Sequence, residues 1–226
     1  MIYFDQVTKI FPPGCKALDN VSFTISEGEF VSIVGKSGAG KTTILRLIIR
    51  EEKPTSGHIY FEGMDISKIR KSRLPYYRRK IGIVYQDYKL LPHRTVFENV
   101  AFALEILGRP GKEIKELVPK VLALVGMEEK MWNFPHQLSG GEQQRTAIAR
   151  AIISQPKVLL ADEPTGNLDP YNTKEIIDLL LKINQLGTAV ILATHNRDVV
   201  NLVKKRVIWL EKGKILKDDS TGTFQL

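Results

Sequence analysis

The sequence holds a single cysteine, Cys15, so no disulfide can form within the chain. Its apolar runs are all shorter than the roughly 18 residues that a helix needs to span a bilayer. The N-terminal segment Met1–Asp5 lacks the basic start and the long apolar core of a signal peptide. These absences argue against a disulfide-stabilised secreted domain and against a membrane-embedded protein. We therefore expect a protein of the cytoplasm.

Positively charged residues are in excess. The chain has 33 Lys and Arg residues against 25 Asp and Glu, a formal net charge of +8, which favours acidic partners. Much of the excess lies in residues 68–80, here called the basic segment, which contains Lys68, Arg70, Lys71, Arg73, Arg78, Arg79 and Lys80. Two interpretations stay open, a solvated helical face and a patch that faces anionic membrane lipid. Binding of nucleic acid is the weaker alternative, because no recognised nucleic-acid module surrounds the segment.

The stretch Gly35–Thr42 fits the pattern Gly, four residues, Gly-Lys-Ser/Thr, which describes a loop that holds nucleotide phosphates. The apolar run Phe30–Val34 before it predicts a buried strand, and the spacing after it predicts a helix that begins near Lys41. Backbone N–H groups of the loop and the positive end of the helix dipole would face the phosphates. Lys41 is expected to contact the β- and γ-phosphates, and Thr42 to ligate Mg²⁺. The predicted ATP-binding residues of this loop are Gly35, Ser37, Gly38, Ala39, Gly40, Lys41, Thr42 and Thr43.

Two adjacent carboxylates, Asp162 and Glu163, end the hydrophobic run Val158–Ala161. A phosphate-bound Mg²⁺ needs a hard oxygen ligand, and Asp162 at the end of a strand can supply it directly or through water. Glu163 comes next and points elsewhere, so it is free to orient or deprotonate an attacking water. We therefore predict Asp162 as a metal ligand and Glu163 as the catalytic base.

Strand and helix patterns alternate along most of the chain. Short strands broken by turns before residue 34 indicate antiparallel pairing. Apolar residues at three- and four-residue spacing, in Val96–Leu107 and Ile114–Val125, predict a helical part at about residues 88–155. Strand, helix and strand then follow at Lys157–Ala161, Thr173–Gln185 and Ala189–Thr194. We predict one α/β domain over residues 1–226, a P-loop NTPase with a mainly parallel core sheet, an N-terminal antiparallel β-subdomain and a helical insertion.

The octapeptide Leu138–Arg145, Leu-Ser-Gly-Gly-Glu-Gln-Gln-Arg, opens a predicted helix. Ser139 and Glu142 have capping-box spacing, so one interpretation is a well-capped helix start. That interpretation leaves Gly140 and Gly141 unexplained, since glycine in a first turn costs stability, whereas close approach to a phosphate would explain them. The octapeptide is the signature of ATP-binding cassette (ABC) ATPases, and the chain resembles this family over nearly its whole length. The resemblance implies that Ser139, Gly140, Gly141 and Glu142 contact ATP.

Further positions match the family's motifs. Gln86 resembles the glutamine that senses Mg²⁺ and the attacking water, which implies both a catalytic and a metal-binding role. His195 resembles the switch histidine that contacts the γ-phosphate, and Asn167–Asp169 resembles the loop that crosses the family's dimer interface. Phe11 resembles the aromatic residue that stacks on adenine, usually a tyrosine, and stacking needs only the ring face. Asn196 stands where an aspartate commonly follows the histidine.

The resemblance also implies an assembly. In the family, each ATP lies between the phosphate loop of one subunit and the signature of the other. A chain with one loop and one signature is therefore expected to form a head-to-tail homodimer that holds two ATP, in an ATP-dependent manner. ATP and Mg²⁺ are the expected ligands, and hydrolysis to ADP and phosphate is the expected reaction.

Within the family, four stretches are most similar to members that act in bacterial cell division: Leu74–Gly82, Tyr85–Leu91, Arg94–Val100 and Asn133–Gln137. This similarity implies an integral membrane partner, a position on the inner face of the cell membrane through that partner, and control of cell-wall hydrolases. Four side chains are candidates for a groove that receives the partner's cytoplasmic helix, with plain core packing as the alternative: Tyr88, Leu90, Leu91 and Phe97.

Other functions stay open at this point. The run Leu160–Asp169 is shared with lipoprotein-release and macrolide-type ATPases, so the motor subunit of a lipoprotein or peptide exporter is an alternative. A nucleic-acid-handling cassette would normally need two cassettes or a coiled-coil insertion, and would bind DNA or RNA with strong salt dependence. A phosphate-loop kinase would leave Leu138–Arg145 without a purpose.

Overall fold

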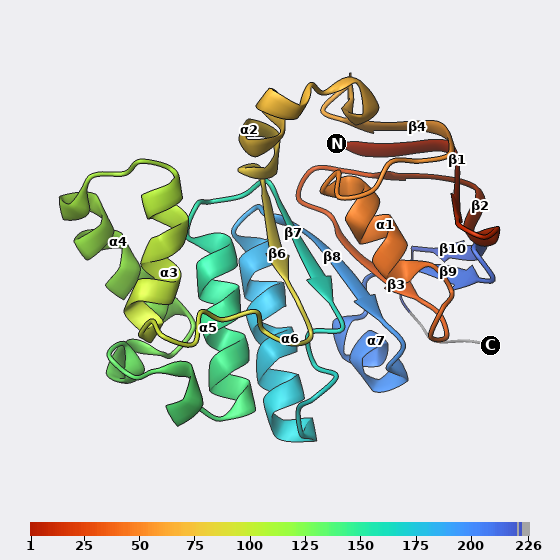
Figure 1. The fold of residues 1–226 in the computed structure, drawn as a ribbon. Coiled ribbons are helices and arrows are strands. Elements are labelled where there is room, and N and C mark those ends of the chain that lie inside the picture. Colours follow the sequence, from red (N-terminus) through yellow and green to blue (C-terminus); the bar gives the residue numbers. More distant parts are fainter. Residues whose placement is uncertain (221, 223–226) are drawn as a thin grey trace.

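Two β-sheets organise the protein (Figure 1). The computed structural model describes residues 1–220 and 222. The larger sheet has the order β10-β9-β3-β8-β7-β6, formed by Lys214–Asp219, Arg206–Glu211, Phe30–Val34, Ala189–Thr194, Val158–Asp162 and Ile81–Val84. The smaller sheet has the order β2-β1-β4-β5, formed by Cys15–Ile25, Ile2–Phe11, Ser56–Phe61 and Met64–Asp65.

The direction of the strands separates the two sheets. In the larger sheet β9, β3, β8, β7 and β6 run parallel, and only β10 pairs antiparallel, with β9. All pairs of the smaller sheet are antiparallel. The mainly parallel core sheet and the N-terminal antiparallel sheet that the sequence predicts are therefore confirmed.

Helices connect the parallel strands. They are α1 (Lys41–Ile48), α2 (Leu74–Arg78), α3 (Val96–Ile106), α4 (Gly111–Leu124), α5 (Gly140–Ile152), α6 (Pro170–Gln185) and α7 (Arg197–Val203). Short 3₁₀ turns lie at Ile66–Lys68, Lys71–Arg73, Glu128–Lys130 and Pro135–Gln137. Within residues 1–220 and 222, every helix is too short or too polar to cross a bilayer.

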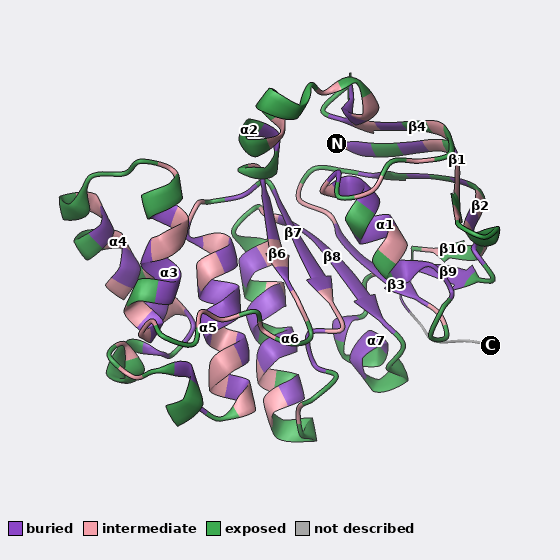
Figure 2. Ribbon diagram, viewed as in Figure 1, coloured by how far each residue is buried: buried purple, intermediate pink, exposed green. Residues whose placement is uncertain are grey.

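Apolar side chains cover both faces of the parallel sheet, as the run of buried residues in β7 illustrates. Leu159 and Ala161 join the core under α3, α4, α5 and α6, while Val158 and Leu160 join the core under α1 and the antiparallel sheet. Alternate residues of a strand point to opposite faces, so a strand that is buried on both sides reads as continuously apolar. Figure 2 shows the parallel strands in the buried colour beneath partly exposed helices. The carboxyl ends of β3, β6, β7 and β8 are thereby held in one rigid edge.

The helices α3 and α4 pack beside α5 on the side of the molecule away from the antiparallel sheet (Figure 1). Thr95 caps α3 with a full capping box, since its hydroxyl accepts from the Glu98 N–H at 3.2 Å and Glu98 accepts from the Thr95 N–H at 2.7 Å. The next residue of α3, Asn99, is fully buried. Its side-chain amide forms hydrogen bonds with the backbone of Leu91, Arg94 and Thr95. The segment that leads into α3 is thus tied to the helix.

Three details differ from the sequence-based expectation. The basic segment is not one helix, because the five-residue α2 begins only at Leu74, next to Pro75. Proline lacks an N–H and disfavours helical geometry in the residue before it, so it belongs in a first turn. The helix α7 and the strands β9 and β10 were not predicted at all. Six predicted elements have ends within three residues of those observed: Phe30–Val34, Val96–Leu107, Ile114–Val125, Lys157–Ala161, Thr173–Gln185 and Ala189–Thr194.

Candidate nucleotide site

The phosphate loop connects β3 to α1, where the sequence places it. Gly40 is the residue before α1 and has φ 109, a left-handed backbone conformation that residues other than glycine rarely adopt. A Cβ atom on Gly40 would also lie 2.6 Å from the carbonyl oxygen of Ala17 in β2. Backbone geometry and close packing thus both require glycine here, and the start of β2 rests directly against the loop.

Lys41 begins α1, and its side chain is buried under the loop, with the residue 6% exposed. The ammonium donates to the carbonyl oxygens of Gly35 at 2.8 Å and Lys36 at 3.3 Å. It also lies 3.4 Å from Oε1 of Glu163, which follows β7. The positive charge is therefore held between the phosphate loop and the carboxylate that the sequence predicts as the base.

Thr42 and Asp162 meet across the two strand ends. The Thr42 hydroxyl donates to Oδ1 of Asp162 at 3.1 Å. Burial raises the pKa of Asp162, the hydrogen bond from Thr42 opposes that rise, and the negative charge of Glu163 adds to it. A buried carboxylate with such a raised pKa favours a cationic ligand, because a nearby positive charge stabilises its ionised form.

A cavity of about 380 Å³ contains all three predicted metal ligands in its lining, Thr42, Gln86 and Asp162. Hydroxyl, amide and carboxylate oxygens are the hard donors that Mg²⁺ prefers. The residues present therefore fit this ion. Arg46 also lines the cavity and was missed by the sequence analysis. Its position four residues after Thr42 puts it on the same face of α1, a spacing that could have indicated it.

Glu163 and His195 contact each other at the site. Oε1 of Glu163 lies 2.8 Å from Nδ1 of His195, and Oε2 accepts the backbone N–H of His195 at 3.3 Å. Glu163 itself has φ 47, so the chain turns sharply after Asp162. The two adjacent carboxylates consequently contact different partners, Asp162 with Thr42 and Glu163 with Lys41 and His195.

Gln86 and Asn167 join the loops that follow β6 and β7. Their side chains approach at 3.4 Å, and the Asn167 amide is also 3.4 Å from the Gln86 carbonyl.

Asn196 caps α7, because its side chain accepts from the N–H groups of Asp198 at 2.9 Å and Val199 at 3.4 Å. Phe11 lies at the end of β1, half-buried, with the Lys9 ammonium 4.6 Å from its ring centre.

The signature residues Ser139–Glu142 make a separate set of contacts. The Ser139 hydroxyl accepts the N–H of Glu142 at 3.3 Å, and Glu142 accepts the N–H of Ser139 at 2.8 Å, which is the capping box of α5. A Cβ on Gly141 would collide with the side chain of Asn172 in α6. Among the described residues, no hydrogen bond or ion pair joins Ser139–Glu142 to Gly35–Thr43. One copy of the chain thus presents the predicted ATP contacts as two separate groups.

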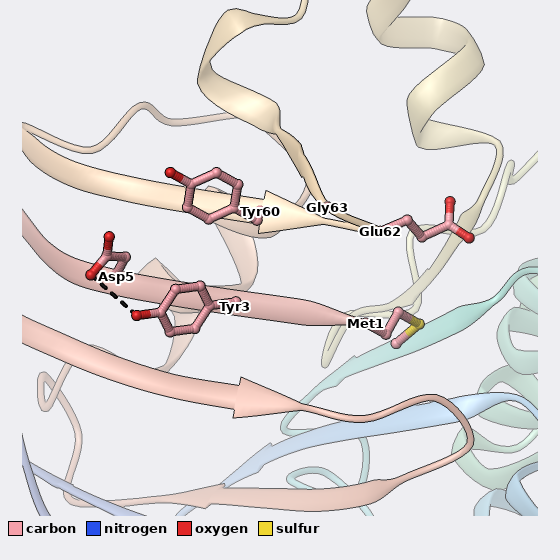
Figure 3. A pocket seen from close by; sticks show the side chains of 6 residues that line it. All are labelled: Met1, Tyr3, Asp5, Tyr60, Glu62 and Gly63. Atoms are coloured by element: carbon pink, nitrogen blue, oxygen red, sulfur yellow. Dashed lines mark hydrogen bonds between the residues drawn. The ribbon is translucent and has the colours of Figure 1, made fainter.

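A different cavity, of about 540 Å³, opens on the antiparallel sheet (Figure 3). It is lined by Met1, Tyr3, Asp5, Tyr60, Glu62 and Gly63. Tyr3 stacks on Tyr60 with ring centres 5.9 Å apart, and its hydroxyl donates to Asp5 at 3.2 Å. None of these residues belongs to a phosphate-binding or catalytic motif, so the candidate site is the one at the ends of β3 and β7.

Three comparisons with known proteins bear on this site. Residues 18–166 match the family described as ABC transporter. The chain is 53% identical over 224 residues to the cell division ATP-binding protein FtsE of Bacillus subtilis (strain 168), covering 99% of this chain and 98% of that protein. It is 46% identical over 225 residues to FtsE of Mycobacterium tuberculosis (strain ATCC 25618 / H37Rv), with coverage of 99% and 98%.

A solved structure of the ATP-binding cassette MJ0796, dimeric, in a post-hydrolysis state and bound to ADP and Pi, has a TM-score of 0.88. It is 37% identical and covers 98% of this chain and 99% of its own. A structure of cbiO1 from Clostridium perfringens, part of the ABC transporter complex cbiONQ, has a TM-score of 0.90 and 32% identity, with 98% of this chain and 88% of its own covered. Family match, identity and fold agree with the loop, the carboxylates and the signature. The chain belongs to the ABC transporter family and is an ATP-binding cassette that hydrolyses ATP.

Proposed function

We propose that this chain is the ATP-hydrolysing subunit of a bacterial membrane complex that acts in cell division, with an FtsX-like integral membrane protein as its partner. The observation that carries this proposal is the 53% identity, over nearly the full length of both chains, to a cell division ATP-binding protein. The complex would pass a mechanical signal to cell-wall hydrolases. The cassette would lie in the cytoplasm, at the inner face of the membrane, as one domain over residues 1–226 with its helical part at about 88–155.

We assign each predicted residue a role in binding or hydrolysing ATP. The phosphate loop and Lys41 would hold the triphosphate, and Phe11 would stack on adenine. Thr42, Asp162 and Gln86 would hold Mg²⁺, which when bound neutralises charge that develops on the phosphates. Glu163 would take the proton of the attacking water, with its Oε1 held 3.4 Å from Lys41 Nζ and 2.8 Å from His195 Nδ1. His195 would hold that carboxylate and contact the γ-phosphate.

A homodimer would bring the two separate groups of ATP contacts together. Ser139–Glu142 of one copy would face the phosphate loop of the other, in two equivalent sites. The solved relatives support this, since MJ0796 is described as a dimer in two structures with TM-scores of 0.88 and 0.89. ATP would thus act as the ligand that closes the dimer, and hydrolysis would reopen it.

Anionic lipid is a proposed second contact of the basic segment. Arg78 and Lys80 are already engaged, Arg78 with the carbonyls of Ile49 and Arg50 and Lys80 with Glu62. Lys68 is also paired, with Asp65 at 3.6 Å. Four cationic side chains of the segment remain for a negatively charged surface: Arg70, Lys71, Arg73 and Arg79. Tyr76 stands among them, 57% exposed, with the guanidinium groups of Arg73 and Arg79 at 5.9 and 4.8 Å from its ring. Cations near an anionic membrane contribute about 1 kcal/mol each.

Isolation of the complex from its native membrane tests the proposed partner. The tagged chain is solubilised with its membrane and the proteins that accompany it are identified by mass spectrometry. An FtsX-like protein is the expected result. A membrane protein with a substrate channel would instead identify the chain as the motor subunit of a lipoprotein or peptide exporter.

Vesicle binding tests the lipid contact separately. A Lys71→Ala, Arg73→Ala, Arg79→Ala variant is compared with a charge-matched control, Lys112→Ala, Lys115→Ala, Lys120→Ala, on α4. We expect the chain and the control to sediment with vesicles that contain phosphatidylglycerol but not with neutral vesicles. The first variant is expected to bind at least tenfold less. Equal binding by both variants would contradict a role for the basic segment.

A further inference from the structure

The segment that follows Gln86 has an unusual backbone. Tyr88 and Lys89 are consecutive residues with φ 58 and 50, both in the left-handed region. Residues with a Cβ adopt this region rarely, and two in succession need surrounding contacts to hold them. The segment, residues 86–89, lies between the metal-binding cavity and the helical part of the protein. The contacts that hold residues 86–89 in this conformation therefore also influence the position of Gln86.

Arg150 of α5 supplies that contact. One guanidinium nitrogen donates to the carbonyl of Lys89 at 2.7 Å and the other donates to the carbonyl of Tyr88 at 2.9 Å. The planar fork of an arginine suits two neighbouring acceptors, and hydrogen bonds from a charged donor are stronger than neutral ones. Arg150 thus binds the backbone at the two residues that have the strained conformation. The same helix, α5, carries the signature residues at its other end.

Tyr88 reaches that other end. A Cβ on Gly140 would lie 3.0 Å from the Tyr88 hydroxyl, so the phenol lies directly against the first residue of α5. Gly140 and Arg150 are ten positions apart, about 15 Å along a helix. Residues 86–89 are therefore hydrogen-bonded to the signature helix near its end and packed against it at its start. Two such attachments restrict rotation of the segment relative to the helix as well as translation.

We propose that Arg150 and Tyr88 are positioning residues that make residues 86–89 and α5 move as one body. This inference rests on the proposed dimer, in which Gln86 serves the ATP site of its own chain and Ser139–Gly141 serve the site of the partner. The position of Gln86 in one site then sets the orientation of the signature that the other site needs. Occupancy of the two sites is thereby coupled within a single chain.

The test uses the Glu163→Gln background, in which ATP is retained, and measures the ATP concentration that produces half-maximal dimer in sedimentation. Arg150→Met keeps the length of the side chain and removes the fork. We expect it to raise that concentration about tenfold, the effect of losing one strong interaction, while monomer affinity for ADP stays within twofold. Arg150→Lys, which keeps the charge and loses the fork, is expected to be intermediate. Arg94→Met, an arginine of the same helical part that pairs with Glu105 instead, is the control.

A double-mutant cycle with Gln86→Ala separates positioning from simple stability. If Arg150 acts through residues 86–89, the double variant requires no more ATP than the worse of the two single variants. If the fold-increases in the required ATP concentration multiply in the double variant, the inference is overturned. A parallel loss of ADP affinity would overturn it as well. If Arg150→Met does not fold, Arg150→Lys carries the same cycle. Failure of the Glu163→Gln chain itself to dimerise with ATP would overturn the proposed dimer together with this inference, whereas dimerisation unaffected by Arg150→Met would overturn the inference alone.

Discussion

Replacement of Glu163 by glutamine is the sharpest test of the catalytic site. The carboxylate lies 2.8 Å from Nδ1 of His195 and 3.4 Å from Nζ of Lys41, so it is held in one orientation by two neighbours. Glutamine has the same shape and keeps one oxygen that can accept from Lys41. It cannot accept a proton from water. The substitution therefore removes the proposed base and preserves the shape of the side chain.

The expected loss follows from the role assigned to this carboxylate. A positioned general base contributes about 10²- to 10⁴-fold to a rate, which is about 3 to 5 kcal/mol of activation free energy. We expect Glu163→Gln to lower single-turnover ATP hydrolysis by that factor. ATP binding should be preserved or tightened, because one negative charge near the phosphates is gone. The ATP-bound dimer should then accumulate.

Hydrolysis is measured by release of labelled phosphate, nucleotide binding by fluorescence titration, and the dimer by sedimentation. Glu128→Gln, an exposed glutamate in the turn after α4, is the matched control and should behave as the unmodified chain. A hydrolysis rate for Glu163→Gln within threefold of the unmodified chain would refute its role as base. Equal loss of binding and of hydrolysis would show that the side chain serves the structure of the site instead.

Substitutions at three further residues test other parts of the structure. Ser139→Arg places a bulky cation at the signature and should abolish the ATP-dependent dimer while monomer nucleotide affinity changes less than twofold; Ser139→Ala, which loses only the cap, should cost about 1 kcal/mol of stability. Asp162 has a pKa raised by burial, so its contribution to stability is present below its ordinary value of 3.8 and is lost as pH rises through the higher folded value. The melting temperature of Asp162→Asn without nucleotide, relative to that of the unmodified chain, should therefore rise as the pH increases above the ordinary pKa of the carboxyl, and a constant difference would contradict this reasoning. Asn99→Ala leaves the Leu91 N–H and the Arg94 carbonyl without the side-chain partner that they have now and should lower the free energy of unfolding in urea by about 2 to 4 kcal/mol; a loss below about 0.5 kcal/mol would show that water replaces these bonds.

The sequence predicts the local structure around the phosphate loop well, for a physical reason. A buried strand, a glycine loop and a helix that follow one another directly are local features, and their spacing carries the geometry. Residues Phe30–Val34 form β3 and α1 begins at Lys41, where the pattern places them. The pairing of Thr42 with Asp162 is not local, yet it follows from the rule that the carboxyl ends of parallel strands share one edge.

Other features depend on contacts that no local pattern carries. The apolar run Val207–Leu210 lies in β9, but a short buried strand and a buried helix segment have the same periodicity. Arg150 has the appearance of an ordinary cation on a helix, and its acceptors are carbonyls about sixty positions earlier. Asn99 stands in an apolar stretch, and only the fold shows that it closes four hydrogen bonds. Backbone acceptors have no sequence identity, so contacts of this kind are invisible before the fold is known.

Two side chains predicted to contact ATP, those of Lys41 and Ser139, already have partners within one copy of the chain. The Lys41 ammonium bonds Gly35, Lys36 and Glu163, and the Ser139 hydroxyl bonds Glu142. Neither side chain therefore has an unmet hydrogen bond that would drive two copies together. In the proposed dimer, the driving force must come from the triphosphate, which offers its own oxygens to Lys41 and to the N-terminus of α5. When hydrolysis removes the γ-phosphate, the internal partners are still present to replace it, so a single copy can return to its own hydrogen bonds without leaving a group unpaired.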